Sequence, residues 1–147
     1  MKNIKKLFNS FDIDGYIIPK NDDYFNEYVS FSSDRLRFIT NFSGSAGFAV
    51  ILREKNYLFV DGRYTTQAQF QSGKNFKIIT IPARLPRDVI KTKKKIILGF
   101  DPKLYTEKKL GILFKTKNIV LKAINKNLVD EVWVNKPQET IKPFFLF

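Results

Sequence analysis

The sequence has 147 residues and contains neither cysteine nor histidine. These two absences exclude disulfides, cysteine-ligated zinc, iron–sulfur clusters and every catalytic triad that needs a cysteine or a histidine from this chain. The net charge is +12 and 44% of the residues are hydrophobic, a composition typical of one folded domain that buries a core of useful size.

The excess positive charge comes mostly from lysines that are spread along the chain. Clustered basic residues would favour a polyanion such as nucleic acid, because neutralised phosphates release their counterions. Only Lys93–Lys95 are contiguous, and no aromatic residue lies among them to stack on bases. We therefore expect no nucleic-acid partner, and a small basic polyanion-binding module stays an alternative.

The chain has no apolar run that approaches the roughly 18 residues of a membrane span. Its basic N-terminus lacks the apolar stretch of a signal peptide. We expect no membrane partner and a cytoplasmic location.

Short helices and strands are predicted to alternate in the first half of the chain. Their apolar spacing and turn residues place them at 4–11 (helix), 16–18 (strand), 25–29 (helical turn), 36–39 (helix), 48–52 and 57–60 (strands) and 64–71 (helix). Arg53–Asn56 separates the two central strands and is typical of a β-hairpin turn. Ser32–Asp34 is expected to cap the helix that follows it.

The second half continues the same alternation. Its predicted elements are a strand at 76–81, a basic and helical crossover at 84–95 interrupted by Pro86, a strand at 96–100, a helix capped by Thr106–Glu107 that reaches Phe114, a strand at 119–121 and a terminal helix or turn at 127–134. The pattern indicates an α/β fold with a mixed β-sheet flanked by helices on both faces.

Three motifs occur in a specific order: RLRFITNFSGSAGFAVI, LFVDGRYTTQA and NLVDEVW. Together they resemble the N-terminal domain of aminopeptidase P, which is shared across the creatinase–prolidase–aminopeptidase P superfamily. The segment GYIIPKNDDYFNEY is similar to an earlier part of the same domain. The resemblance extends over roughly Gly15 to Pro137. It implies a domain over 1–137 and a C-terminal tail or truncated linker over 138–147.

The resemblance also implies a function. Members of this family cleave the bond between an N-terminal residue and a following proline, using a metal pair, usually manganese, that a separate C-terminal domain binds. Because no such domain follows in this sequence, the resemblance implies no catalytic residue and no metal or other cofactor in this chain. The expected partners are a second copy, in a homodimer, or a separate catalytic chain of an aminopeptidase P. The expected role is dimerisation or the shaping of access to a partner's active site, and the alternative is the relic of a truncated or split peptidase gene.

The Gly44–Gly47 segment has two interpretations. Glycines let backbone N–H groups converge on an anion, but the Lys-Ser/Thr of a P-loop and the spacing of a dinucleotide-binding loop are both missing. A tight turn that leads into a strand is the interpretation we favour. In the following Asp61–Tyr64 segment, Asp61 is expected to cap the next helix. The cap does not explain Arg63 and Tyr64, and we expect these two residues to face an interface.

Several further charged residues need an interpretation. The loop residues Asp22, Asp23 and Glu27 either hold a hard cation or form a solvated acidic loop, and we favour the solvated loop. Arg35 and Arg37 are expected on the exposed side of their helix. An all-carboxylate site built from the strand-edge residues Asp14, Asp61 and Asp101 is a remote enzyme alternative. The family architecture implies an interface or active-site mouth formed by Asp22, Tyr28, Arg37, Ser45, Asp61, Arg63 and Tyr64.

Overall fold

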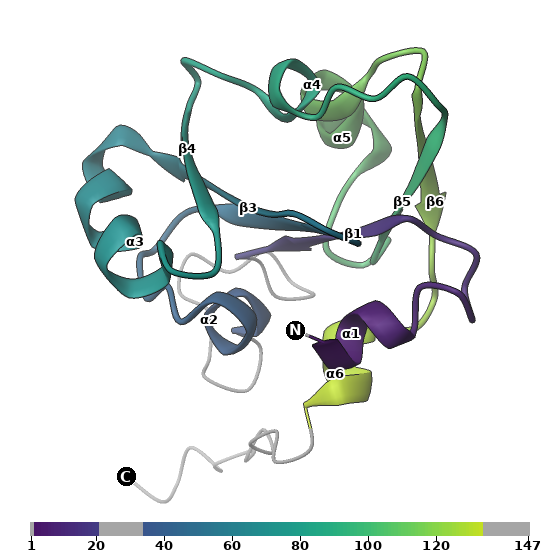
Figure 1. Cartoon of the computed structure of the whole chain (residues 1–147), viewed down its shortest axis with the longest axis horizontal. Coiled ribbons are helices and arrows are strands. Elements are labelled where there is room, and N and C mark those ends of the chain that lie inside the picture. Colours follow the sequence, from purple (N-terminus) through teal and green to yellow (C-terminus); the bar gives the residue numbers. More distant parts are fainter. Residues whose placement is uncertain (1, 21–33, 134–147) are drawn as a thin grey trace, which may run out of the picture.

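The computed structural model describes residues 2–20 and 34–133, which form one mixed sheet with helices packed against it (Figure 1). The sheet has six strands in the order β4-β3-β2-β1-β5-β6. The strands are β1 (Gly15–Pro19), β2 (Phe48–Leu52), β3 (Asn56–Asp61), β4 (Lys77–Ile81), β5 (Ile96–Phe100) and β6 (Ile119–Ala123). The helices are α1 (Lys2–Lys6), α2 (Arg35–Thr40), the 3₁₀ turn η2 (Gly62–Tyr64), α3 (Thr65–Ser72), α4 (Pro86–Val89), α5 (Glu107–Phe114) and α6 (Leu128–Val132).

The sheet is mixed because β2 runs antiparallel to both of its neighbours. β2 pairs antiparallel with β3 and also antiparallel with β1, so that Val50 lies opposite Tyr57 on one side and opposite Ile17 on the other. The pairs β3–β4, β1–β5 and β5–β6 are parallel. Among the described strands, β2 alone therefore runs against the rest. The end of β1, the start of β2 and the end of β3 consequently meet at one edge of the sheet.

The central strands are buried on both faces, and alternate residues enter two separate cores. Tyr16 and Leu58 belong to the core beneath α1, α2, α3 and α6, whereas Ile17, Val50 and Phe59 belong to the core beneath α4 and α5. Figure 1 shows α4 and α5 on one side of the sheet, with α1, α2 and α6 on the other. The α/β class, the mixed sheet and the helices on both faces are thus as the sequence predicts.

Two predicted helices differ from those in the structure. α1 ends at Lys6, and tighter turns continue to Asp12, whose φ is +55°. The crossover expected over 84–95 contains only a four-residue helix, and Pro86 begins it instead of interrupting it. Proline fits the first turn of a helix because its fixed φ is already helical and its missing N–H would have no partner there.

Candidate functional site

Three chain segments meet at the edge of the sheet where β1 and β3 end and β2 begins. We call this the loop edge and define it as Lys20, Gly44–Gly47 and Asp61–Tyr64. The register places Phe48 opposite both Pro19 and Phe59, so the three segments leave neighbouring strands. The backbone N–H of Lys20 donates to the Gly47 carbonyl over 3.1 Å and joins the first two segments. Ser45, Asp61, Arg63 and Tyr64 of the predicted interface all lie here, whereas Arg37 is exposed on α2.

The glycine segment is a turn held closely against its surroundings. Gly47 has φ +152°, a conformation that side chains disfavour, and a Cβ on Gly44 would lie 2.2 Å from the Phe42 ring. Ser45 Oγ and the Tyr64 hydroxyl are 2.5 Å apart and share a hydrogen bond. The glycines therefore serve a tight turn with close packing, which agrees with the interpretation favoured from the sequence.

Polar side chains of α3 attach the preceding residues to the same edge. The Gln71 side-chain oxygen accepts a hydrogen bond from the Ser43 backbone N–H over 3.0 Å. The side-chain amides of Gln67 and Gln71 both donate to Ser43 Oγ, over 3.0 and 2.8 Å. The sequence does not predict these contacts, because glutamines on an exposed helix face carry no distinctive pattern.

The Asp61–Tyr64 segment is a capped turn with a cation on its outer side. The Asp61 carboxylate accepts from the Arg63 backbone N–H over 2.9 Å and from Arg63 Nε over 3.1 Å. The Arg63 guanidinium lies 5.4 Å from the centre of the Tyr64 ring, and 76% of this arginine side chain is exposed. Asp61 therefore caps the turn as predicted, while Arg63 stays accessible to a partner.

The stabilising effect of Asp61 is expected to depend on pH. Hydrogen bonds from the backbone and side chain of Arg63 lower the pKa of Asp61 below its ordinary value. A carboxyl group whose pKa is lowered by folding stabilises the fold above its unfolded pKa, about 3.9, and loses this effect as the pH falls through the folded value. Asp61→Asn should therefore be less stable than the wild type at pH 7, and the difference should shrink toward zero at acidic pH. Urea unfolding of both proteins at neutral and acidic pH measures it, and a pH-independent difference would contradict the assignment.

The two flanks of the predicted acidic loop are held together by a buried ion pair. Lys20 Nζ contacts the Asp34 carboxylate, and both side chains are about nine-tenths buried. Asp34 also accepts from the Arg37 backbone N–H over 3.1 Å and caps α2, as the sequence predicts. Asp22 and Tyr28 of the predicted interface, together with the cation-binding alternative for Asp22, Asp23 and Glu27, lie outside the described residues.

The NLVDEVW motif anchors α6 to α2. Asp130 accepts from Arg35 Nε over 2.8 Å and from Arg35 Nη2 over 3.0 Å, in a two-pronged ion pair. The Trp133 ring stacks on Phe38 with 4.4 Å between their centres. The expectation that Arg35 lies on the exposed side of its helix is therefore wrong: its side chain is 7% exposed, because α6 covers it.

Asn127 anchors the other end of the same motif. Its side-chain oxygen accepts from the backbone N–H groups of Val129 and Asp130, and its amide donates to Asp101 over 2.9 Å. The Tyr16 hydroxyl accepts from the backbone N–H of Leu128 over 3.3 Å, and burial raises the pKa of this phenol so that it stays neutral. The motif therefore has a structural role: it attaches α6 to α2, to Asp101 and to Tyr16.

The remote all-carboxylate site is not formed. Asp14 precedes β1 and so lies at the edge of the sheet opposite Asp61, which ends β3. Asp101 follows β5, which is separated from β3 by both β1 and β2. Within residues 2–20 and 34–133, no group of three or more acidic side chains could hold a metal ion. The structure therefore gives the three aspartates separate structural partners in place of a shared site.

A cavity of about 300 Å³ opens beside the loop edge. Its lining includes Lys20, Ser45–Phe48, Ile81, Tyr105 and Lys109. The Lys20 ammonium is paired with Asp34, and burial raises the pKa of the Tyr105 phenol so that it stays protonated.

In the part of the chain that the structure describes, no helix is both long and apolar enough to cross a bilayer.

The same fold occurs as the N-terminal domain of several peptidases. The chain superimposes on an X-prolyl aminopeptidase from Caenorhabditis elegans with a TM-score of 0.76 and 25% identity, over 93% of this chain and 25% of that one. It also superimposes on the N-terminal domain of the cytoplasmic peptidase PepQ from Mycobacterium tuberculosis with a TM-score of 0.63 and 21% identity, over 88% of this chain and 94% of that one. The fold is therefore that of the N-terminal domains of such peptidases.

The sequence comparison identifies the family. The family model for the creatinase/prolidase N-terminal domain matches residues 1–124, and the chain belongs to this family. A probable Xaa-Pro aminopeptidase P from Pyrenophora teres f. teres is 33% identical over 141 residues, which cover 90% of this chain and 22% of that protein. Aminopeptidase P1 from Lotus japonicus is 35% identical over 135 residues, which cover 88% and 20%. The chain thus corresponds to the non-catalytic N-terminal domain of Xaa-Pro aminopeptidases and spans about a quarter or less of these relatives.

Proposed function

We propose that this chain acts as the non-catalytic domain of an Xaa-Pro aminopeptidase-type metallopeptidase and narrows access to a partner's active site. Its loop edge faces the catalytic domain, and steric selection of short Xaa-Pro peptides is its contribution. The hydrolytic chemistry and the manganese-type metal pair are supplied by that partner, in the cytoplasm. The observation that carries the proposal is the match to the creatinase/prolidase N-terminal domain, together with the likeness to 22% of a relative that is named a probable Xaa-Pro aminopeptidase P.

The accessible groups near the loop edge support this orientation. Arg63 presents a largely exposed guanidinium, and α3, which directly follows η2, carries Phe70 with 91% of its side chain exposed. Exposed aromatic and arginine side chains are enriched where protein interfaces gain their binding energy. The tight Gly44–Gly47 turn and its bond to Tyr64 give this edge a fixed shape, which steric selection of substrates requires.

Capture of the protein from its own cells tests the proposal. An antibody raised against the folded domain recovers the protein with its companions, and mass spectrometry then identifies the peptides. We expect peptides from a metal-binding peptidase domain, whether it belongs to the same polypeptide or to another one. Recovery of this domain alone, or only with copies of itself, would refute the access role and favour the relic of a split gene or simple self-association.

Variants of the exposed residues test the orientation. Arg63→Ala combined with Phe70→Ala should alter the ratio of kcat/KM for a short and a long Xaa-Pro peptide, measured on the captured assembly with Mn²⁺. Val120→Ala is the control, because Val120 is 43% exposed near the start of β6 and so lies at the opposite end of the strands from the loop edge. An equal effect of both variants on this ratio would show that the loop edge has no special part in substrate selection.

A further inference from the structure

We propose a second site at the edge of the sheet opposite the loop edge, a cavity that binds a small carboxylate with an apolar body. The cavity measures about 360 Å³ and lies between the hairpin turn that joins β2 to β3 and the segment that joins α4 to β5. This volume falls at the lower end of the range for small-molecule pockets, roughly 300–1,000 Å³. Because it lies away from the loop edge, the site is independent of the proposed peptidase role.

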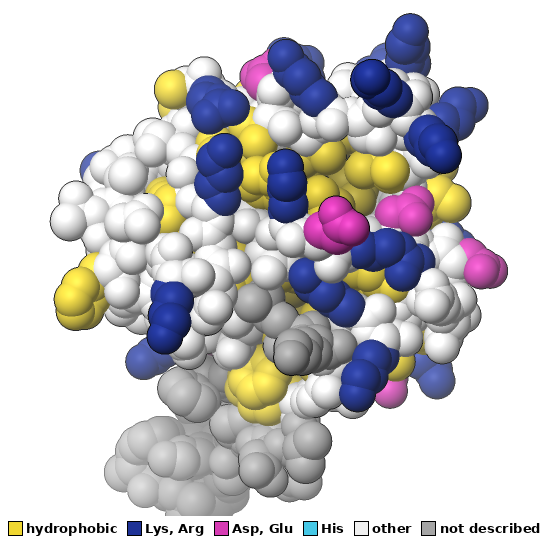
Figure 2. All heavy atoms as spheres, viewed as in Figure 1, with side chains coloured by type: hydrophobic (Ala, Val, Ile, Leu, Met, Phe, Trp, Pro, Cys, Tyr) yellow, Lys and Arg dark blue, Asp and Glu magenta, His cyan; other side chains and the backbone are white. Residues whose placement is uncertain are grey.

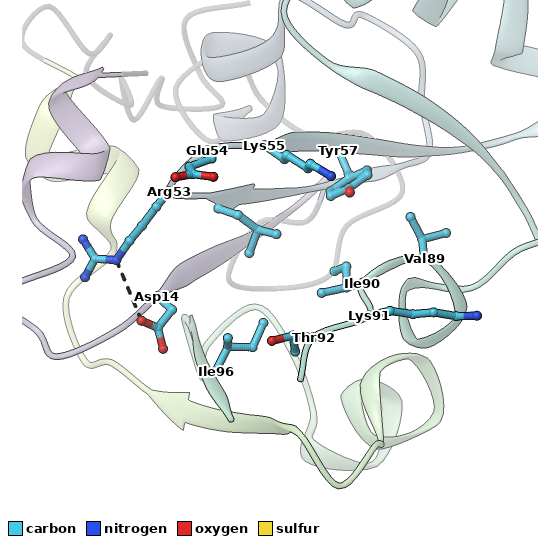
Figure 3. A pocket seen from close by; sticks show the side chains of 11 residues that line it. Asp14, Arg53, Glu54, Lys55, Tyr57, Val89, Ile90, Lys91, Thr92 and Ile96 are labelled. Carbon is cyan, nitrogen blue, oxygen red and sulfur yellow. Dashed lines mark ion pairs between the residues drawn. The ribbon is translucent and has the colours of Figure 1, made fainter. Parts of the chain in front are cut away.

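The cavity has an apolar floor with charged side chains around it. Tyr57 comes from the hairpin, and Val89, Ile90 and Ile96 face it from the other segment (Figure 3). Leu52, at the end of β2, also lines the cavity. In the space-filling view, hydrophobic side chains form a patch on the upper part of the visible face, with basic side chains around it (Figure 2). A ligand that leaves water for this floor gains from the burial of its apolar surface.

The charges of the lining favour a single negative charge on the ligand. The lining includes three cationic side chains (Arg53, Lys55 and Lys91) and two acidic ones (Asp14 and Glu54). Its net charge is therefore +1. Asp14 is already occupied, because it accepts from the Ile97 backbone N–H over 2.8 Å and lies 3.8 Å from Arg53 Nε. A ligand with a single carboxylate therefore neutralises the net charge of the lining.

Two donors on the hairpin are positioned for that carboxylate. In Figure 3 the Lys55 side chain extends toward Tyr57, whereas Lys91 points away from the cavity and Arg53 points toward Asp14. Tyr57 as a whole is only 6% exposed, but its hydroxyl is not among the buried side-chain atoms that lack a hydrogen-bond partner, so it meets the water of the cavity that Tyr57 lines. A ligand oxygen in the cavity takes the place of that water and accepts a hydrogen bond from the hydroxyl. We assign the carboxylate to Lys55 and Tyr57 and the apolar body to the floor.

Titration with three probes tests the assignment. By ¹H–¹⁵N correlation spectroscopy, 4-phenylbutyrate should shift the amide signals of residues 52–57 and 89–96. The neutral 4-phenylbutan-1-ol should bind several-fold more weakly because it lacks the charge, and acetate at least about tenfold more weakly because it lacks the apolar body. Equal binding of the alcohol, shifts elsewhere on the molecule, or no shifts at millimolar 4-phenylbutyrate would overturn the proposal.

Two conservative variants separate the donors from general charge effects. Lys55→Gln and Tyr57→Phe should each weaken 4-phenylbutyrate binding about fivefold. The controls are Lys108→Gln, which removes an exposed charge from α5, and Tyr105→Phe, which removes the hydroxyl of another buried tyrosine in the same core. A control that weakens binding as much as its partner variant would contradict the site, provided that thermal melts show all four variants to be folded.

Discussion

Phe59→Ala is expected to lower the free energy of unfolding by about 4 kcal/mol, since truncation of a buried phenylalanine removes its burial energy and leaves a cavity. Phe59 is fully buried on β3, in the core beneath α4 and α5. Its ring stacks on Phe48 of the neighbouring strand with 4.9 Å between the ring centres. A loss of this size is a large part of the roughly 5–15 kcal/mol that stabilises a typical domain.

The matched control is Phe70→Ala, which makes the same chemical change at a side chain that is 91% exposed. It should alter the unfolding free energy by less than about 0.5 kcal/mol. Both values come from urea unfolding followed by circular dichroism. If the two substitutions were equally destabilising, the assignment of Phe59 to the core would be wrong.

Asp130→Asn is expected to destabilise the domain by about 2–3 kcal/mol. The substitution keeps the shape of the side chain but removes the negative charge opposite Arg35, whose side chain is only 7% exposed. Breaking a buried ion pair typically costs about 3–5 kcal/mol, and we expect less here because Asp130 itself is 31% exposed and water screens part of the interaction.

Glu131→Gln provides the control for this charge change. Glu131 is the next residue of α6, and it is exposed. Its substitution removes the same unit of charge from the same helix and should change stability by a few tenths of a kcal/mol. Comparable losses in the two variants would mean that the ion pair between α2 and α6 contributes nothing specific.

The sequence predicts those features whose signals are local. The hairpin is readable because two apolar runs flank a polar turn, and the caps at Asp34, Asp61 and Thr106 are readable because a capping side chain bonds to backbone groups two or three residues ahead. The family resemblance, carried by motifs in a fixed order, gives the sheet and its two helical layers. All of these follow from neighbours in the chain or from the order of motifs.

The contacts between distant residues could not be predicted in this way. Lys20 and Asp34 are 14 positions apart and Arg35 and Asp130 are 95 apart, and no spacing rule links such pairs. The burial of Arg35 does not follow from the sequence for the same reason, because a short helix does not reveal which later element will cover it. The position of Pro86 at the start of α4 does not follow from the sequence either, because proline both ends helices and begins them and the residues around it do not distinguish the two.

The distance along the chain between α2 and α6 has a consequence for the order of events during synthesis. At about 5–20 residues per second, a ribosome needs roughly 5–20 s to add the 95 positions that separate Arg35 from Asp130. During that interval the nascent chain carries Arg35 without this partner, and the apolar surface of α2 lacks its cover from α6. This ion pair can therefore form only after α6 emerges, and the preceding seconds are the period in which a chaperone would find the apolar surface of α2 exposed.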